Sequence, residues 1–204
     1  MSEAEPRHFS MIRGFHLADV FTMANGACGV AAIFAAIRYA VSGEPRHLVL
    51  AACLIPLAIA FDFLDGRVAR WRHTSSPMGR EMDSLADVVS FGVAPAAVAY
   101  AAGLDGVGDQ AILLCFAACG LSRLARYNVT AEKLAEGSLS GKVPYFEGTP
   151  ITFSIIPLTL LLLALQARWS PAASPLGLTT HLMALPFLVS GGLMISKTIR
   201  IPKP

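Results

Sequence analysis

The chain has 204 residues, of which 54% are apolar and only 15% charged, and its formal net charge is +2. Soluble domains carry about a quarter charged residues, so this composition indicates an integral membrane protein. The small net charge argues against a nucleic-acid-binding protein. The cysteines lie in apolar runs without zinc-ligand spacing, so we expect buried free thiols and no disulfides.

The first segment mixes apolar and charged residues at helical spacing. Phe9, Ile12 and Phe15 recur three apart between basic and acidic side chains. This pattern predicts a juxtamembrane amphipathic helix within residues 1–20 that lies in the headgroup layer. A first spanning helix is expected over residues 21–41, long enough for a hydrocarbon core of about 30 Å. Its small residues would let another helix approach closely.

Charge enters the next two predicted helices. The apolar part of the second helix, residues 48–60, reaches full length only if the helix continues through Asp62 and Asp65 to about residue 71. A third helix over about residues 79–102 carries Asp83 and Asp87. Ionisable residues in membrane helices usually face a cavity and usually serve function.

Three further helices complete the predicted fold. They cover about residues 111–127, 150–167 and 180–196, with a loop at 105–109 and a long polar connection at 128–147. The expected fold is therefore all-α integral membrane, with six transmembrane helices. A single domain over residues 1–204 would comprise the interfacial helix (1–20), the six-helix bundle (21–196) and a cytoplasmic tail (197–204).

The basic residues predict the orientation. All but three of the 16 Lys and Arg residues fall on the side of both termini, and the exceptions are Arg38, Arg46 and Arg168. The positive-inside rule then places both termini and the aspartates in the cytoplasm. We expect a multi-pass protein of the cell (inner) membrane that contacts membrane lipids.

Four aspartates have the spacing of a metal site. Asp62 and Asp65 are three residues apart, and Asp83 and Asp87 are four apart, so each pair lies on one helix face. Four neighbouring carboxylates need compensating cations. A pair of divalent ions would supply that charge, and oxygen ligands suit magnesium, manganese or calcium.

These residues also carry a family resemblance. The pattern Asp62-x2-Asp65-Gly66-x2-Ala69-Arg70-x8-Gly79-x3-Asp83-x3-Asp87 resembles the full signature of the CDP-alcohol phosphatidyltransferases. The resemblance implies six membrane helices, a juxtamembrane N-terminal helix and a homodimer. It also implies transfer of a phosphatidyl group from a CDP-linked lipid, here CDP-diacylglycerol, to an alcohol, with release of CMP.

The resemblance assigns roles to the signature residues. Asp62, Asp65 and Asp83 would ligate two divalent cations, Mg²⁺ or Mn²⁺, and Asp87 would share one ion and act as general base. The CDP-lipid would contact Gly66, Ala69 and Arg70. From the residues themselves we add four further candidates for CDP-lipid contacts: Thr22, Asn25, Ser76 and Gly79.

The acceptor alcohol is predicted from other segments. Residues 90–96 and 120–128 resemble the phosphatidylserine synthase branch of the family, and so do residues 146–151 except for Thr149. Arg123 and Arg126, three apart at a helix end, can pair with the carboxylate of L-serine. They can equally hold the phosphate of glycerol phosphate or inositol phosphate, so these acceptors, and choline, remain alternatives to serine.

Two other classes of function remain open from the sequence. The aspartates could form the ion site of a proton- or cation-coupled carrier, although no internal repeat supports this. They could also bind a structural metal in a protein without turnover. Release of CMP from a CDP-lipid separates the transferase from both.

Overall fold

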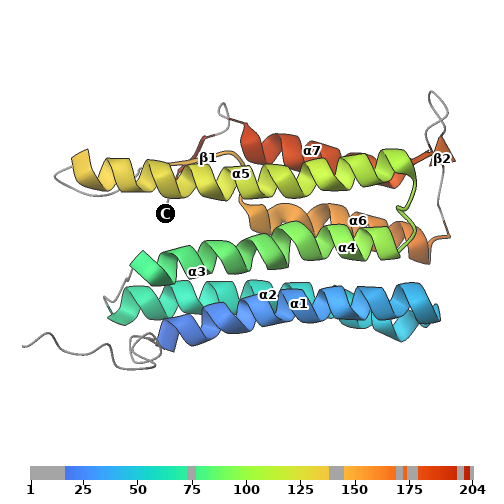
Figure 1. Cartoon of the computed structure of the whole chain (residues 1–204), viewed down its shortest axis with the longest axis horizontal. Helices are drawn as coiled ribbons and strands as arrows, with labels where there is room; N and C mark the ends of the chain where they lie inside the picture. The colour runs from blue at the N-terminus through green and yellow to red at the C-terminus, as the bar shows by residue number, and fades with distance from the viewer. Residues whose placement is uncertain are drawn as a thin grey trace, which may run out of the picture.

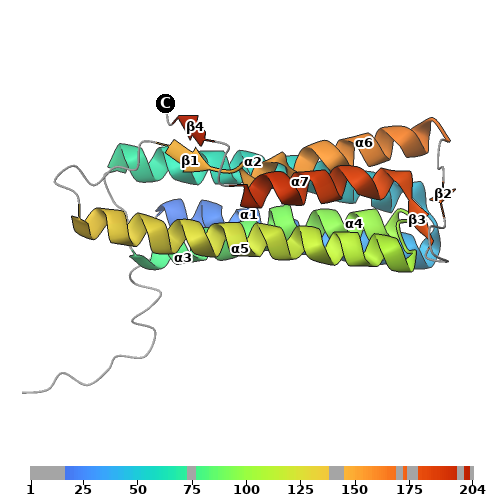
Figure 2. The same cartoon turned by 90° about the horizontal axis from the view of Figure 1, so that it is seen from above.

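The computed structural model describes residues 17–72, 77–137, 145–168, 172–173, 179–196 and 200–202. The predicted juxtamembrane helix falls almost wholly outside these residues, and so does Ser76. Helices dominate the described part of the chain, and they run along a common long axis (Figures 1 and 2).

The first two helices form a hairpin. Helix α1 covers Leu17–Ser42 and α2 covers Pro45–Arg72. Gly43 joins them with a φ of +68°, in the left-handed region that glycine adopts without a steric penalty. Helix α2 continues without a break through Asp62 and Asp65. The prediction that this helix reaches full length only by including the acidic residues is therefore confirmed.

The third rod of the bundle consists of three segments in line. Helix α3 covers Pro77–Asp87, a π-helical turn covers Val88–Val93, and α4 covers Ala94–Ala101. Figure 1 shows α3 and α4 following one another along one axis. The sequence predicted the helix but not the π-helical turn, which begins directly after Asp87.

The fourth rod is longer than expected. Helix α5 covers Val107–Gly137. The prediction of an entirely polar connection over residues 128–147 is wrong in its first part, because the helix continues to Gly137. The first ten residues of this predicted connection therefore belong to helix α5.

The last two helices are short. A 3₁₀ turn at Ile151–Ser154 leads into α6, Ile155–Gln166, and one at Leu182–Ala184 leads into α7, Leu185–Ile195. Figure 1 shows α6 and α7 covering one half of the bundle, while α3 lies toward the other end.

Two short antiparallel strand pairs accompany the helices. β1 (Tyr145–Glu147) pairs with β4 (Arg200–Pro202), and β2 (Ala172–Ala173) pairs with β3 (Thr180–His181). Arg200–Pro202, which form strand β4, lie within the segment expected as the cytoplasmic tail, residues 197–204. The segment expected to begin the sixth helix, at residue 180, starts instead with strand β3.

The bundle is suited to a membrane. Within the described residues, four helices are long and apolar enough to cross one, namely Ala18–Ser42, Pro45–Val68, Met78–Ala101 and Val107–Thr130. Large apolar side chains such as Phe34, Leu114 and Val189 are exposed on the outside, where a soluble monomer would rarely gather them. The chain is an all-α protein with the character of a multi-pass membrane protein.

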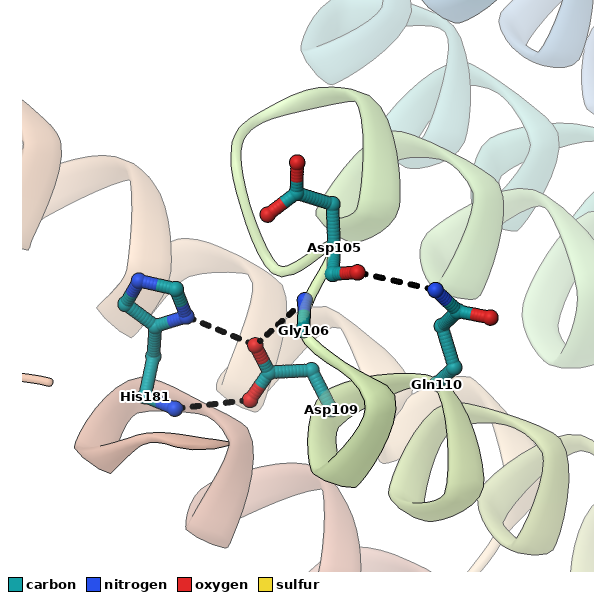
Figure 3. A network of polar contacts seen from close by, with 5 residues as sticks. All are labelled: Asp105, Gly106, Asp109, Gln110 and His181. Carbon is teal, nitrogen blue, oxygen red and sulfur yellow. Dashed lines mark hydrogen bonds and ion pairs between the residues drawn. The ribbon is translucent and has the colours of Figure 1, made fainter. Parts of the chain in front are cut away.

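A buried carboxylate fastens the end of the bundle away from α3. Asp109 accepts hydrogen bonds from the backbone N–H groups of Gly106 (3.1 Å) and His181 (2.7 Å), and its Oδ2 lies 2.6 Å from Nδ1 of His181 (Figure 3). Asp109 is completely buried. It therefore ties the first turn of α5 to strand β3, which leads into α7.

Small residues allow α1 to approach the third rod. A Cβ placed at Gly29 would lie 2.5 Å from Oγ and 2.7 Å from Cα of Ser90. Gly26 faces Ala86 at 3.4 Å in the same way. The prediction that glycines of the first helix let another helix approach closely is confirmed.

We expect Gly29→Ala to destabilise the protein by about 1–3 kcal/mol, because the backbone of the π-helical turn must move away from α1. The measurement is thermal unfolding of the purified chain in detergent. Gly192→Ala in α7 is the matched control, because no atom of the described part of the chain lies within 4 Å of its added Cβ. Equal stabilities of the Gly29 variant and the wild type would contradict the close approach.

Candidate metal and nucleotide site

Three carboxylates from two helices converge on one point. Asp62 comes from α2, and Asp83 and Asp87 from α3. Each offers a carboxylate oxygen, and these oxygens lie within 4.8 Å of one another. The spacing along each helix turns the side chains inward, so the structure brings together three of the four aspartates singled out in the sequence.

Asp65 lies beside this group and is held separately. Its Oδ2 accepts a hydrogen bond of 2.9 Å from Oγ1 of Thr22 in α1, and its side chain is only 6% exposed. Asp65 lies close enough to Asp62 and Asp83 for ionised carboxylates at these positions to repel one another. The four carboxylates therefore form one acidic region, in which Asp65 is bound to a neighbouring helix.

The three converging residues fit a divalent cation. Carboxylates at this separation repel one another unless positive charge lies between them. In addition, Oδ1 of Asp83 is buried and accepts no hydrogen bond from any described residue. A buried carboxylate oxygen without a donor is costly, and a cation would satisfy it. Oxygen ligands of this kind suit Mg²⁺ or Mn²⁺.

Gly66 leaves open space next to the acidic region. Among the described residues, a Cβ placed there would have only Nη1 of Arg70 within 4 Å, at 3.9 Å. Arg70 itself is exposed, one turn further along α2. Gly79 lies in the first turn of α3, and Ala69 lies in α2 between Gly66 and Arg70. An open helix backbone and an exposed guanidinium are features that can bind a phosphate or a base.

Thr22 and Asn25, two other candidates for CDP-lipid contacts, are buried in α1. Thr22 is 4% exposed and donates to Asp65. Asn25 is 0% exposed, and its Nδ2 donates to Oδ1 of Asp87 over 3.0 Å. Both side chains therefore contact the aspartates directly.

The two arginines of α5 have different environments. Arg123 is 8% exposed, its Nε has no hydrogen-bond partner among the described residues, and the charge of Asp87 acts on it. Arg126 is less buried, and both of its terminal nitrogens donate to the carbonyl of Ile195 at 3.4 Å. Of these two arginines, Arg123 is the one that combines burial with a donor left unused by the described residues.

A polar network between α3 and α5 was missed in the sequence. Nδ2 of Asn128 donates to Oε2 of Glu81 (3.2 Å) and to Oγ of Ser84 (3.0 Å), and Oγ of Ser84 lies 3.2 Å from Oδ1 of Asn128. Ser84 lies next to Asp83, so the network borders the acidic region. The available signal was the position of Asn128 in the segment with both arginines, two residues beyond Arg126.

Comparisons with a family sequence profile and with individual proteins point to the same family. Residues 15–190 match the sequence profile of the CDP-alcohol phosphatidyltransferases. A relative from Saccharomyces cerevisiae, a CDP-diacylglycerol–serine O-phosphatidyltransferase, is 44% identical over 98% of this chain and 75% of its own length.

Two bacterial relatives carry the same name. The protein from Bacillus subtilis is 35% identical over 70% of this chain and 72% of its own length. The protein from Helicobacter pylori is 33% identical over 90% of this chain and 70% of its own length. The match thus extends well beyond the aspartate motif.

Proposed function

The chain belongs to the CDP-alcohol phosphatidyltransferase family, and from this membership we propose how its residues carry out the reaction. The chain is a phospholipid-synthesising transferase that moves the phosphatidyl group of CDP-diacylglycerol to L-serine, giving phosphatidylserine and CMP. The observation that carries the proposal is the convergence of Asp62, Asp83 and Asp87 within 4.8 Å.

We propose that these three aspartates, with Asp65 beside them, hold two divalent cations, Mg²⁺ or Mn²⁺. When bound, the cations neutralise the phosphate oxygens that would otherwise repel a nucleophile. Oδ1 of Asp83 supports this role, because it is buried, accepts no hydrogen bond from the described residues, and could bind a cation. Family members generally use divalent metals, so the acidic region has a clear chemical purpose.

Asp87 is proposed to act as the general base. It lies at the C-terminal end of α3 and is 9% exposed, so little water competes for its carboxylate. As the serine oxygen attacks the phosphorus of the phosphatidyl group, Asp87 accepts the hydroxyl proton. The new serine O–P bond forms while the P–O bond to CMP breaks, and CMP leaves with that electron pair.

The nucleotide is proposed to lie along the end of α2. The open backbone at Gly66 supports a close approach of the CDP moiety, and Arg70 can donate to a phosphate oxygen. Ala69, Gly79 and Ser76 would complete this side of the site. Thr22 and Asn25 of α1 adjoin it through Asp65 and Asp87.

Arg123 is proposed to bind the carboxylate of serine. Arg123 is buried, its Nε has no hydrogen-bond partner among the described residues, and its charge interacts with that of Asp87. A serine carboxylate bound there would bring the acceptor hydroxyl toward the base. Arg126 is the weaker candidate for acceptor binding, because the carbonyl of Ile195 already accepts from it.

We expect Arg123→Gln to raise the KM for serine about 10- to 100-fold, because hydrogen bonds to a charged group contribute about 1.5–3 kcal/mol. The KM for CDP-diacylglycerol should change little. Arg126→Gln is the matched variant and should change the KM for serine less than about threefold. Steady-state CMP release at varied serine measures both, and the reverse ranking would contradict the assignment.

An acceptor screen tests the function itself. Purified protein receives CDP-diacylglycerol, Mg²⁺ or Mn²⁺ and one candidate alcohol, and CMP is measured. We expect strong CMP release with serine and little with glycerol phosphate, inositol phosphate or choline. Strong release with another alcohol would refute the acceptor, and no release with any would refute the transferase in favour of a carrier or a structural metal protein.

The arrangement in the membrane is also proposed. The four long helices, together with α6 and α7, would give six spans within a single domain over residues 1–204. The basic residues favour both termini and the aspartates on the cytoplasmic side of the cell membrane. A homodimer follows from the family resemblance. Addition of a membrane-impermeant thiol reagent to single-cysteine variants in vesicles would test the orientation.

A further inference from the structure

Helix α1 donates a hydrogen bond to two carboxylates that belong to two other helices. Thr22 binds Asp65 of α2 over 2.9 Å, and Asn25 binds Asp87 of α3 over 3.0 Å. Thr22 and Asn25 are three residues apart, so they lie on the same face of α1. One helix therefore fixes acidic side chains on both of its neighbours.

The burial of Thr22 and Asn25 argues against direct contact between these side chains and the CDP-lipid. No part of Asn25 is accessible to water, and Thr22 is 4% exposed. A CDP-lipid could reach Asn25 only if the surrounding helices moved apart. Oγ1 of Thr22 also lies 3.3 Å from the carbonyl of Ala18, but its single proton favours the nearer and charged acceptor, Asp65.

The backbone of Asn25 is used as well as its side chain. Oγ of Ser90, in the π-helical turn, donates to the carbonyl of Asn25 over 2.9 Å, and Ser90 is completely buried. The missing side chain at Gly29 permits this approach. The segment that carries Asp87 is thus held to α1 at Asp87 and again three residues later, which fixes both its position and its rotation.

We propose that Thr22 and Asn25 are positioning residues that set the spacing of the cation-binding carboxylates, rather than residues that contact the CDP-lipid. The amide of Asn25 occupies Oδ1 of Asp87 and leaves Oδ2 for a cation or for the serine proton. The amide neither takes up nor releases a proton, so it orients Asp87 without competing in proton transfer. This inference rests on the proposed function only in that the aspartates bind cations.

The test measures Mn²⁺ binding without substrate, by electron paramagnetic resonance of free Mn²⁺ over the full-length chain in detergent. Residues that orient metal ligands typically change metal affinity about 10- to 100-fold when they are removed. We expect that loss for Asn25→Leu and Thr22→Val, with the KM for CDP-diacylglycerol within about twofold of wild type. Thr22→Ser keeps the hydroxyl and should retain wild-type affinity.

Thr159→Val is the control for removal of a hydroxyl elsewhere, because Thr159 bonds only the carbonyl of Ile155 in its own helix among the described residues. It should leave Mn²⁺ affinity unchanged. Unaltered Mn²⁺ affinity in Asn25→Leu and Thr22→Val, with a raised KM for CDP-diacylglycerol, would overturn the positioning role and restore direct contact. That outcome would leave the proposed transferase function standing, whereas a wrong function would appear as no CMP release from the wild type.

Asn25→Leu could fail to fold, which thermal unfolding would show. The comparison of Thr22→Val with Thr22→Ser then tests the positioning role.

Discussion

Asp87→Asn is expected to lower CMP release by about 10²- to 10⁴-fold, the range that a general base contributes. Asparagine has the same shape as aspartate but cannot accept the serine proton. It also offers only one neutral oxygen to a cation. The side-chain amide of Asn25 could then meet either the carbonyl or the NH2 group of the new asparagine. Its hydrogen bond would therefore no longer hold the side chain at position 87 in one orientation. CMP release at saturating serine and CDP-diacylglycerol is the measurement.

The control for this substitution is Asp105→Asn. Asp105 is exposed and lies near Asp109, just before the start of α5 (Figure 3). The control should retain wild-type activity and stability. If Asp87→Asn releases CMP at more than about a tenth of the wild-type rate, the base must be another group.

Removal of divalent cations is expected to reduce CMP release to below detection, because the cations would neutralise the phosphate oxygens that otherwise repel the attacking alcohol. Dialysis against EDTA followed by exchange into metal-free buffer makes the test. Addition of Mg²⁺ or Mn²⁺ should restore the rate. In Asp62→Asn, the Mn²⁺ concentration that gives half of the maximal rate should rise about 10-fold or more, since one charged ligand is lost.

The control for chelation is a measurement that the fold remains intact. The helical content, measured by circular dichroism, should survive EDTA, because the core of α1, α2 and α4 consists of apolar residues such as Ala32, Ile55 and Val98. CMP release that persists after complete chelation would exclude the cation-dependent reaction, whereas loss of helical content would indicate a structural metal.

Much of the site could be predicted because it depends on short-range spacing. Asp62 and Asp65, like Asp83 and Asp87, are separated by about one helical turn, so the shared face follows from helix geometry alone. The length of α2 could also be predicted, because its apolar part is too short to span a membrane without its acidic end.

Other features depend on how the helices meet, and the sequence does not encode those contacts locally. Asp65 has the same chemistry as Asp62, yet it is bound by Thr22 of α1, 43 residues away. Asn25 was predicted as a contact of the CDP-lipid, and the structure buries it completely with its amide on Asp87, 62 residues away. The continuation of α5 to Gly137 was missed because a polar helix beyond the apolar core has the composition of a loop.

The π-helical turn at Val88–Val93 has a consequence for the whole third rod. A residue in an α-helix advances the face by about 100°, so one inserted residue changes which side of everything downstream points inward. The π-helical turn lets the acidic residues before it and the fully buried Val98 after it both point into the bundle. The number of residues in this turn is therefore constrained, as well as their identity. Deletion of one residue would restore a regular α-helix, and either the carboxylates or the apolar face of α4 would then rotate away from the bundle.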